Sequence, residues 1–412
     1  MFGSVLIENI GELLTCTGDG RVHDGGGAGS GGGIGLVRNA AVAIRNGRVV
    51  YAGPTAELPP GFGSDERIDA HGQLVTPGLV DPHTHLVFAG SRAGEFDLRN
   101  QRKSYLEIQQ AGGGILATVT ATRAASDQAL HEGALARLDR FLAQGVTLVE
   151  AKTGYDLTIA GERRLLAALQ AARESHVVDV SPTLLAHVPP PNGERARFVR
   201  AFCDELIPTT NADAVDVYCD EGAFSLAETR AILEAGKRHR KRLRVHAEQF
   251  TYTGAAELAA ELGATSVEHL EQLSPEAPAK LAAAGVVCNL LPGAALTLKL
   301  PWPDAGRLYA AGCTVALGTD CNPGSSLSES LPLMMTLACT QMGLSAAQAW
   351  LGVTRAAALS VGRDDAGQLA PGARGDLVIW DADDHRQVPQ HYGVPLARTV
   401  IVRGVVAYRR ES

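Results

Sequence analysis

Short apolar runs alternate with amphipathic helical stretches from residue 79 to residue 317 of this 412-residue chain, and this alternation limits the possible folds more than any other feature. The runs that we predict as strands are residues 79–80, 146–150, 178–185, 215–217, 243–245, 266–267, 286–290 and 314–317. Eight strand–helix units predict an α/β fold, a (β/α)8 TIM-type barrel, for which about 280 residues is a usual size. A doubly wound sheet is the rival architecture, but no GxGxxG motif follows an early strand.

Four of the intervening helices have clear signals. Ser126 is a typical N-cap, and the helix that it opens carries Leu130, Leu138 and Leu142 and ends at Gly145. The other three are predicted at residues 160–174, 225–239 and 253–262. Their positions between the predicted strands support the barrel.

Both ends of the chain have the alternating pattern of β structure. The candidate strands are residues 4–7, 41–44 and 48–51 near the N-terminus, and 375–381 and 398–404 near the C-terminus. Neither end has enough strands to form a core alone, so we predict one small β-sandwich domain built from both termini. This composite domain is predicted to comprise residues 1–77 and 364–412, and the barrel residues 78–363.

A glycine-rich segment, residues 25–33, interrupts the N-terminal strands. We interpret it as a flexible low-complexity loop. A phosphate-binding loop is the alternative, but no Gly-Lys-Ser or Gly-Lys-Thr follows and no helix is predicted to begin there.

Charge and cysteine content limit the partners and the compartment. The net charge is −8, with 45% hydrophobic and 20% charged residues, which is ordinary for a soluble globular protein and predicts no nucleic-acid partner and no anionic membrane partner. No apolar run is long enough to span a bilayer and no signal peptide is recognisable, so we expect a cytoplasmic protein. The seven cysteines include no CxxC pair, so neither a disulfide framework nor a thiolate zinc site is predicted. A homodimer is the default expectation.

Two histidines follow the first predicted barrel strand. His83 and His85 are two positions apart. Because alternate side chains of an extended strand point to the same side, both imidazoles can reach one metal ion. The pair follows a Thr-Pro-Gly turn and an apolar strand, which favours a metal pair over two solvated loop histidines.

Further residues of metal-ligand type follow later strands. His246 comes at the end of the fifth predicted strand, His269 at the end of the sixth and Asp320 after the eighth. In a barrel of this kind, residues just past the carboxyl ends of the strands converge on the active-site face. Together with His83 and His85, they predict one metal site rather than five unrelated core or loop residues.

One divalent ion bound by three histidines and a carboxylate retains a position for water, as a catalytic site requires. Such an ion lowers the pKa of the water and supplies hydroxide near neutral pH. Asp320 can take the proton and pass it on, so we predict it as a catalytic residue as well as a ligand. His269 can bind the metal weakly, orient the hydroxide or polarise a carbonyl group.

A site with two metals bridged by a carboxylated lysine is the alternative. Lys152 is the candidate for that lysine. It follows the second predicted strand, however, and the fourth strand ends in Tyr218-Cys219-Asp220-Glu221 without a lysine. We therefore favour one metal.

Residues 75–85, the later His246, His269 and Asp320, and residues 375–378 together resemble the amidohydrolase superfamily. The resemblance spans nearly the whole chain. It implies hydrolysis of a C–N bond at a carbonyl or amidine carbon by a metal-activated hydroxide.

Residues 86–92, 105–108, 112–115, 150–155, 186–187, 246–249 and 319–325 resemble one branch of that superfamily. The resemblance implies hydrolysis of the cyclic C–N bond of 4-imidazolone-5-propanoate to N-formimidoyl-L-glutamate in histidine degradation, with zinc or iron as the metal. The metal ligands would be His83, His85, His246 and Asp320, and the catalytic residues Asp320 and His269. The residues that bind the substrate, a small molecule with a carboxylate, would be Arg92, Tyr155, His187, Gln249, Asn322, Gly324 and Ser325.

The chemistry of these residues is compatible with that substrate. Arg92 lies seven residues past His85, so its guanidinium can reach the same site and hold a carboxylate bidentately; a plain surface charge is the alternative. Tyr155 and His187 follow the second and third strands and can form hydrogen bonds with the ring, although Tyr155 can also be an ordinary packed aromatic residue. The turn after Asp320 can approach a ligand closely or be simply a tight loop.

The general base stays open between three residues. Gln249 cannot act as a base, which leaves Asp320 and His269, with Glu248 as the third candidate. Two other functions are also open. A deaminase of cytosine or guanine type would use the same metal site but release ammonia, and a barrel that binds metal without catalysis would need no open coordination position.

Overall fold

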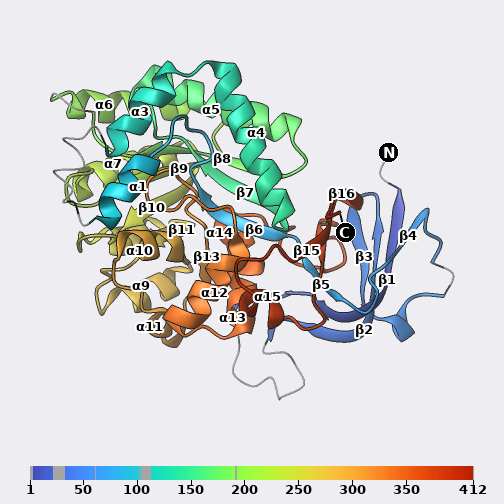
Figure 1. Ribbon diagram of the computed structural model, residues 1–412. Helices are drawn as coiled ribbons and strands as arrows, with labels where there is room; N and C mark the ends of the chain where they lie inside the picture. The colour runs from blue at the N-terminus through green and yellow to red at the C-terminus, as the bar shows by residue number, and fades with distance from the viewer. Residues whose placement is uncertain are drawn as a thin grey trace.

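The computed structural model describes residues 3–21, 33–60, 62–101, 103, 113–190 and 193–411. A barrel and a terminal sheet lie side by side, and both ends of the chain are on the side of the terminal sheet (Figure 1). Except for Gly33, the glycine-rich segment at residues 25–33 lies outside the described residues, so its interpretation as a loop stays a prediction.

Eight parallel strands form a nearly closed barrel, in the spatial order β13-β12-β11-β10-β9-β8-β7-β6. This confirms the predicted TIM-type barrel, and each of the eight predicted runs overlaps one strand. The strands are β6 (Leu79–Thr84), β7 (Val146–Lys152), β8 (Asp179–Ala186), β9 (Ala214–Cys219), β10 (Arg242–Ala247), β11 (Ser266–His269), β12 (Val287–Leu290) and β13 (Val315–Leu317).

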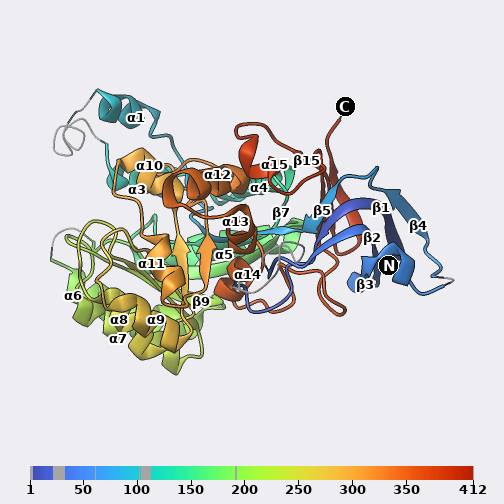
Figure 2. The ribbon, with the colours of Figure 1, turned by 90° about the horizontal axis from the view of Figure 1, so that it is seen from below.

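Most of the helices surround the barrel on its outer side, whereas α1 lies apart from the others at one end (Figures 1 and 2). These helices are α1 (Ala93–Asn100), α3 (Ile115–Ala124), α4 (Asp127–Ala143), α5 (Ile159–Ser175), α6 (Arg195–Ala201), α7 (Leu226–Arg238), α8 (Ala255–Leu262), α9 (Ala277–Ala284), α10 (Pro292–Leu298), α11 (Ala305–Ala310), α12 (Leu331–Met342), α13 (Ala346–Gly352) and α14 (Arg355–Val361). The four helices with clear sequence signals are α4, α5, α7 and α8, and Ser126 caps α4 by accepting a hydrogen bond from the Ala129 backbone N–H, as predicted.

Strands from both termini form one separate sheet, which confirms the composite β domain. Its order is β16-β15-β14-β5-β1-β2-β3, and β4 also pairs with β1. The N-terminal members are β1 (Ser4–Leu14), β2 (Leu36–Arg45), β3 (Arg48–Pro54), β4 (Glu66–Asp69) and β5 (Leu74–Pro77), and the C-terminal members are β14 (Leu377–Trp380), β15 (Ala397–Val402) and β16 (Val405–Arg409). The residue boundaries of the two domains stay a prediction.

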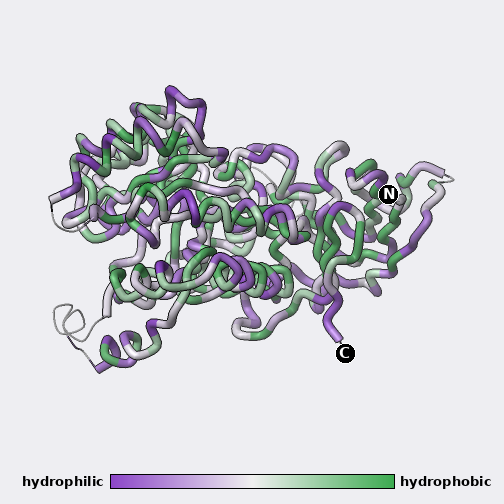
Figure 3. Tube along the Cα trace, turned by 90° about the horizontal axis from the view of Figure 1, so that it is seen from above, coloured by the Kyte–Doolittle hydropathy of each residue, from purple (hydrophilic) through white to green (hydrophobic). Residues whose placement is uncertain are grey.

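The hydrophobic core continues from the barrel into the terminal sheet. Trp350 on α13 and Trp380 on β14 are both fully buried, with their ring centroids 5.5 Å apart. Hydrophobic segments gather in the interior, whereas hydrophilic and hydrophobic positions alternate along the outer helices (Figure 3). Within the described residues, no helix is long and apolar enough to cross a membrane.

The last strand closes against the first close to the histidine pair. Thr84 at the end of β6 forms a parallel bridge with Cys321, which follows β13. The His85 N–H donates to the Cys321 carbonyl at 3.0 Å, and the Asp320 N–H donates to the His83 carbonyl at 3.0 Å. The backbone therefore brings the predicted ligands of β6 and the segment after β13 together.

Candidate active site

The five predicted ligand-type residues lie at the carboxyl ends of four barrel strands. His83 is in β6 and His85 follows it, His246 is in β10, His269 ends β11, and Asp320 comes three residues after β13. All five are nearly or fully buried. The barrel thus brings together residues that are up to 237 positions apart in the sequence, 320 against 83.

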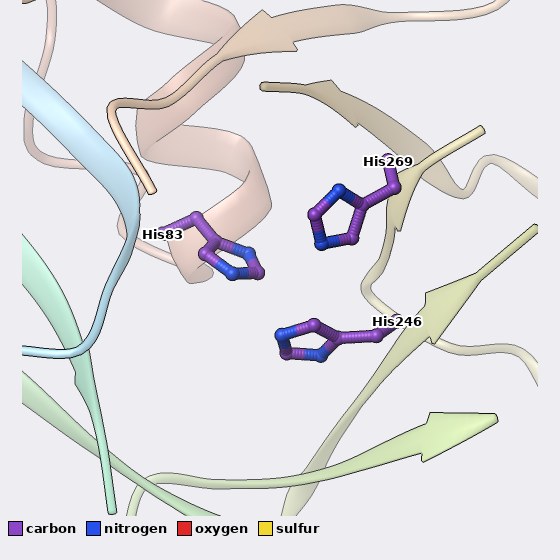
Figure 4. Close-up of side chains that lie close together, drawn as sticks. All are labelled: His83, His246 and His269. Carbon is purple, nitrogen blue, oxygen red and sulfur yellow. The ribbon is translucent and has the colours of Figure 1, made fainter. Parts of the chain in front are cut away.

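The five side chains form two overlapping groups. His83, His246 and His269 make one group and His83, His85 and Asp320 the other, and within each group the potential ligand atoms lie within 4.8 Å of one another. The rings of the first group point into one shared space from three strands (Figure 4). Asp320 Oδ1 lies 3.5 Å from His83 Nε2 and 3.3 Å from His85 Nε2.

The site fits a divalent metal ion. His83 Nε2 and His246 Nε2 are buried polar atoms without a hydrogen-bond partner. Buried polar atoms normally have a partner, and an ion is one of the accepted explanations when they do not. Neutral imidazole and carboxylate are ligands that zinc and other first-row ions accept.

Buried carboxylates hold the opposite nitrogens of these two histidines. Glu268 Oε2 lies 2.9 Å from His83 Nδ1, and Asp216 Oδ1 lies 3.1 Å from His246 Nδ1. Each carboxylate accepts the Nδ1 proton and thereby fixes the tautomer that leaves Nε2 free for a metal. Neither residue was predicted, although a charged residue beside valine, within a predicted strand for Asp216 and directly after one for Glu268, is a signal that could have found them.

Each of these carboxylates also contacts a buried cation. Lys152 Nζ lies 2.8 Å from Asp216 Oδ2 and 2.9 Å from Glu150 Oε1. Arg244 Nη1 donates to Glu268 Oε1 at 3.2 Å. Burial acts to lower the pKa of Lys152, but Asp216 and Glu150 outweigh it and the pKa is raised, so the amine is an ammonium group. Lys152 is therefore part of the support of His246, which agrees with the preference for one metal.

Burial and neighbouring charges set the protonation of the site. Burial, Lys152 and the other histidines hold the pKa of His83 well below its ordinary value, so its imidazole is neutral, as a metal ligand must be. Burial acts to raise the pKa of Asp320, but the hydrogen bond with His85 and the nearby histidines outweigh it and the pKa is lowered. Asp320 is thus a carboxylate at neutral pH.

A cavity of about 400 Å³ opens over these residues. Of the predicted ligand-type residues, His85, His246, His269 and Asp320 line it. All the predicted substrate-binding residues line it as well, namely Arg92, Tyr155, His187, Gln249, Asn322, Gly324 and Ser325. The structure therefore brings the two predicted sets into one cavity, while the role of each residue stays a prediction.

Arg92 reaches the cavity but has a partner that the sequence analysis missed. Its Nε donates to Glu95 Oε2 at 2.8 Å and its Nη2 donates to Glu95 Oε1 at 2.5 Å. Glu95 thus takes the Nε–Nη2 edge of the guanidinium, and the Nη1–Nη2 edge is the one left that could hold a substrate carboxylate bidentately. Glu95 is three residues, about one helical turn, after Arg92. An opposite charge at this spacing is the sequence signal that would have suggested the pair.

Tyr155, His187 and Gln249 have their hydrogen-bonding groups arranged around the cavity. Burial raises the pKa of Tyr155, so its phenol is a donor. Burial, followed by the neighbouring His85, lowers the pKa of His187. The neutral ring donates from Nδ1 to the Gly154 carbonyl at 3.1 Å, which leaves Nε2 as an acceptor. The Tyr218 hydroxyl donates to Gln249 Oε1 at 2.9 Å, so the Gln249 amide nitrogen is left as a donor.

The loop after β13 is fixed by its own side chains. Asn322 Oδ1 accepts from the Gly324 and Ser325 N–H groups at 2.8 Å each, and Asn322 Nδ2 donates to the Asp320 carbonyl at 2.6 Å. The Ser325 hydroxyl donates to Asp320 Oδ2 at 3.3 Å. Asp320 itself has a φ of 51°, an uncommon value for a residue with a side chain. Asn322 therefore acts in this structure as the organiser of the loop that holds Asp320.

Glu248 does not line the cavity, because its carboxylate is bonded to the backbone at the start of α8. Its carboxylate accepts from the backbone N–H groups of Thr253, Gly254, Ala255 and Ala256 at the start of α8. These bonds satisfy the free N–H groups of a helix N-terminus. Of the three candidates for the general base, Asp320 and His269 line the cavity and Glu248 does not.

Barrel, cavity and donor set together define a metal-dependent hydrolase of the amidohydrolase type. Residues 74–406 match the amidohydrolase family. The chain belongs to this family, and it is accordingly a hydrolase that acts on C–N bonds.

The curated relatives include imidazolonepropionases. The chain is 45% identical over 382 residues to imidazolonepropionase from Myxococcus xanthus, covering 90% of this chain and 91% of that protein. It is also 45% identical over 385 residues to imidazolonepropionase from Geobacillus kaustophilus, again covering 90% and 91%. Among solved structures, it is similar to a zinc complex of atrazine chlorohydrolase from Arthrobacter aurescens, with a TM-score of 0.70, 18% identity, and 98% of this chain and 95% of that chain covered. That last likeness shows the fold alone.

Proposed function

We propose that this chain hydrolyses the cyclic C–N bond of 4-imidazolone-5-propanoate to N-formimidoyl-L-glutamate, a step of histidine degradation. The observation that carries the proposal is a single cavity lined both by residues of metal-ligand type and by Arg92. A flat polar ring with a propanoate side chain needs such a combination, because hydrolysis requires activated water and the carboxylate requires a cation. The imidazolonepropionases at 45% identity support the same substrate.

We propose that His83, His85, His246 and Asp320, which come from the two overlapping groups, would hold one metal ion, zinc or iron. When bound, such an ion lowers the pKa of a coordinated water and polarises a carbonyl group. Glu268 and Asp216 orient the rings of His83 and His246 toward it.

Comparison of the substrate with the product shows which proton must be transferred. The oxygen of water adds to the ring carbonyl carbon, the bond from that carbon to the ring nitrogen breaks, and one proton passes from the water to the departing nitrogen. Asp320, a buried carboxylate, takes this proton and returns it to the nitrogen. His269, on the opposite side of the cluster from β6, orients the carbonyl oxygen by hydrogen bonding.

The remaining cavity residues bind the substrate. Arg92 binds the propanoate group, and Tyr155 and His187 form hydrogen bonds with the ring as donor and acceptor. The Gln249 amide nitrogen donates to a ring or carbonyl acceptor because Tyr218 occupies the amide oxygen. Asn322, Gly324 and Ser325 shape the wall beside Asp320.

The direct test is incubation of metal-analysed protein with 4-imidazolone-5-propanoate. We expect loss of the ultraviolet absorbance of the substrate together with one equivalent of N-formimidoyl-L-glutamate and no release of ammonia. Ammonia release from a cytosine or guanine ring would instead support the deaminase. Inertness of metal-loaded protein toward all these rings would support a barrel that binds metal without catalysis. Metal analysis of the active protein distinguishes zinc from iron.

Asp320→Asn tests the proposed proton transfer. An amide cannot take the proton from water, so we expect turnover to be lost at every pH. The metal content is measured in parallel, since Asp320 is also a proposed ligand. Retained turnover would assign the general base elsewhere, with His269 as the next candidate.

The oligomeric state and the cellular compartment are also matters of proposal. We propose a homodimer in the cytoplasm that has a small molecule as its substrate and neither nucleic acid nor membrane as a partner. Sedimentation analysis at several protein concentrations tests the dimer.

A further inference from the structure

Glu95, on α1, is surrounded by donors at the wall of the cavity. Its Oε2 accepts from Arg92 Nε at 2.8 Å and from the Gly114 N–H at 2.7 Å. Its Oε1 accepts from Arg92 Nη2 at 2.5 Å and from Arg99 Nη2. An ionised carboxylate has about four acceptor sites, so these four donors use the whole group. The Glu95 side chain is 6% exposed, and its bonds are therefore shielded from water.

These bonds leave one edge of the Arg92 guanidinium free. Nε and one hydrogen of Nη2 face Glu95, so the two hydrogens of Nη1 and the second hydrogen of Nη2 remain for another acceptor. Nη1 lies against Gly324, where a Cβ atom built on the glycine would be only 2.1 Å away. Glu95 on one side and Gly324 on the other thus fix the plane of the guanidinium.

Arg99 completes the arrangement. Its Nη1 donates to the Gly324 carbonyl at 3.0 Å while its Nη2 contacts Glu95. The last turn of α1 is therefore bonded to the loop that carries Asp320. Two guanidinium groups share one carboxylate, so Arg92, Arg99 and Glu95 together keep one net positive charge, which a single substrate carboxylate would neutralise.

We propose that Glu95 is a positioning residue for substrate recognition: it holds Arg92 so that the Nη1–Nη2 edge of the guanidinium meets the substrate carboxylate, and Gly324 is glycine because the guanidinium occupies the space of a side chain. The inference rests on the proposed function, because it requires a substrate with a carboxylate. It goes beyond the prediction that Arg92 binds this group, since it assigns the orientation of Arg92 to a residue that does not touch the substrate.

Glu95→Gln tests the proposal with two substrates. The amide has the same shape but no charge, and its NH2 group cannot accept from either arginine, so Arg92 loses its fixed orientation. We expect KM for 4-imidazolone-5-propanoate to rise about tenfold or more and kcat to change by less than about threefold. For the propanamide analogue, which has no carboxylate, we expect KM to stay within about twofold of wild type.

Glu261→Gln is the matched control. Glu261 forms a bidentate pair with Arg230 on the outer surface and does not line the cavity. The same change of charge at that position is expected to leave both parameters at wild-type values for both substrates.

Gly324→Ala provides a second test that does not depend on the folding of Glu95→Gln. The backbone of Gly324 does not have a positive φ, so alanine is allowed and only the end of the Arg92 side chain must move. We expect the same rise in KM for the carboxylate substrate and a smaller change for the propanamide analogue.

The outcomes separate the inference from the proposed function. If wild-type protein does not hydrolyse 4-imidazolone-5-propanoate, the proposed function is wrong. If wild-type protein does so while both variants keep its KM, the inference is wrong and the function stands. Equal losses of kcat for both substrates in both variants would also overturn it, because they would show a merely structural role.

Discussion

Single residues at the carboxyl ends of the strands decide the chemistry of this barrel. The predicted ligand-type residues do converge, but two of the histidines depend on buried carboxylates for their orientation. Asp216 joins Lys152 to His246, and Glu268 joins Arg244 to His83. A buried charge without a partner costs several kcal/mol. Removal of one member of either chain of contacts would therefore leave an unpaired buried charge and destabilise the protein.

Asp216→Asn is expected to weaken metal binding. The amide keeps the shape of the side chain but carries no charge for Lys152 and accepts the His246 proton less strongly. Loss of such an outer partner typically lowers metal affinity by about 10- to 100-fold. Competition with a chelator, followed by metal analysis, measures the change.

Asp376→Asn is the control for that experiment, because Asp376 is also buried and paired, with Arg374, but lies beside the terminal sheet. It should lower stability without changing metal affinity. Unchanged metal affinity in Asp216→Asn would show that His246 does not need its carboxylate.

Whole helices and strands were predictable because their signals are local. Ser225 and Glu228 form a capping box at the start of α7, and this type of pattern is visible in the sequence. What the sequence does not contain is the second partner of Glu228, Arg195, which donates to both carboxylate oxygens from a position 33 residues away. The hydrogen bonds from Arg195 come first among the causes that lower the pKa of Glu228 to about 2.

Glu228→Gln is expected to have a pH-dependent effect on stability. The ordinary pKa of glutamate in an unfolded chain is about 4.3, so the stabilisation from the ionised group is complete well above that pH and is lost as the pH falls toward 2. The side chain is partly exposed, so solvent screens its ion pair, and we expect the variant to be less stable by only about 1 kcal/mol at pH 7. Urea unfolding at pH 7, 5 and 3.5 measures the difference.

Glu234→Gln on the same helix is the control, since Glu234 makes only a 3.8 Å contact with Arg230. Its effect should be small at every pH. A Glu228→Gln deficit that stays constant down to pH 3.5 would contradict the assigned cause.

At the scale of the molecule, one hydrophobic cluster runs from the barrel into the terminal sheet, which also has a second cluster of its own. Trp380 packs against Trp350 and donates from Nε1 to the Thr76 hydroxyl at 2.8 Å, while Trp350 Nε1 donates to the His385 carbonyl at 2.9 Å. Because both rings are fully buried at the contact between the two units, the units are expected to unfold together.

Trp380→Ala should lower the free energy of unfolding by about 3–5 kcal/mol, the usual cost of removing a large buried aromatic side chain. Urea unfolding is followed by tryptophan fluorescence and by far-ultraviolet circular dichroism, and the two transitions should shift together. Trp302→Ala, at a partly exposed position between α10 and α11, is the control and should cost much less. A variant whose terminal sheet unfolds first, with the barrel midpoint unchanged, would contradict a shared core.

The sequence by itself determined the elements and the residue types at their ends. Hydrophobic periodicity, caps and turns are signals that extend over only a few residues. They made it possible to predict the eight barrel strands and helices such as α4. They also placed His83, His246 and Asp320 at or just past the ends of strands. The resemblance then indicated the reaction and the cavity residues.

Only the tertiary structure decided which side chains meet. That Asp216 supports His246, that Glu248 caps α8 instead of facing the cavity, and that Arg92 lies against Gly324 all depend on distances set by barrel closure and side-chain direction. The pattern along one strand or helix carries no information about these distances, because the partners come from different elements. The physical cause is that burial forces each charged group to find a partner, and the fold determines which partner is near enough.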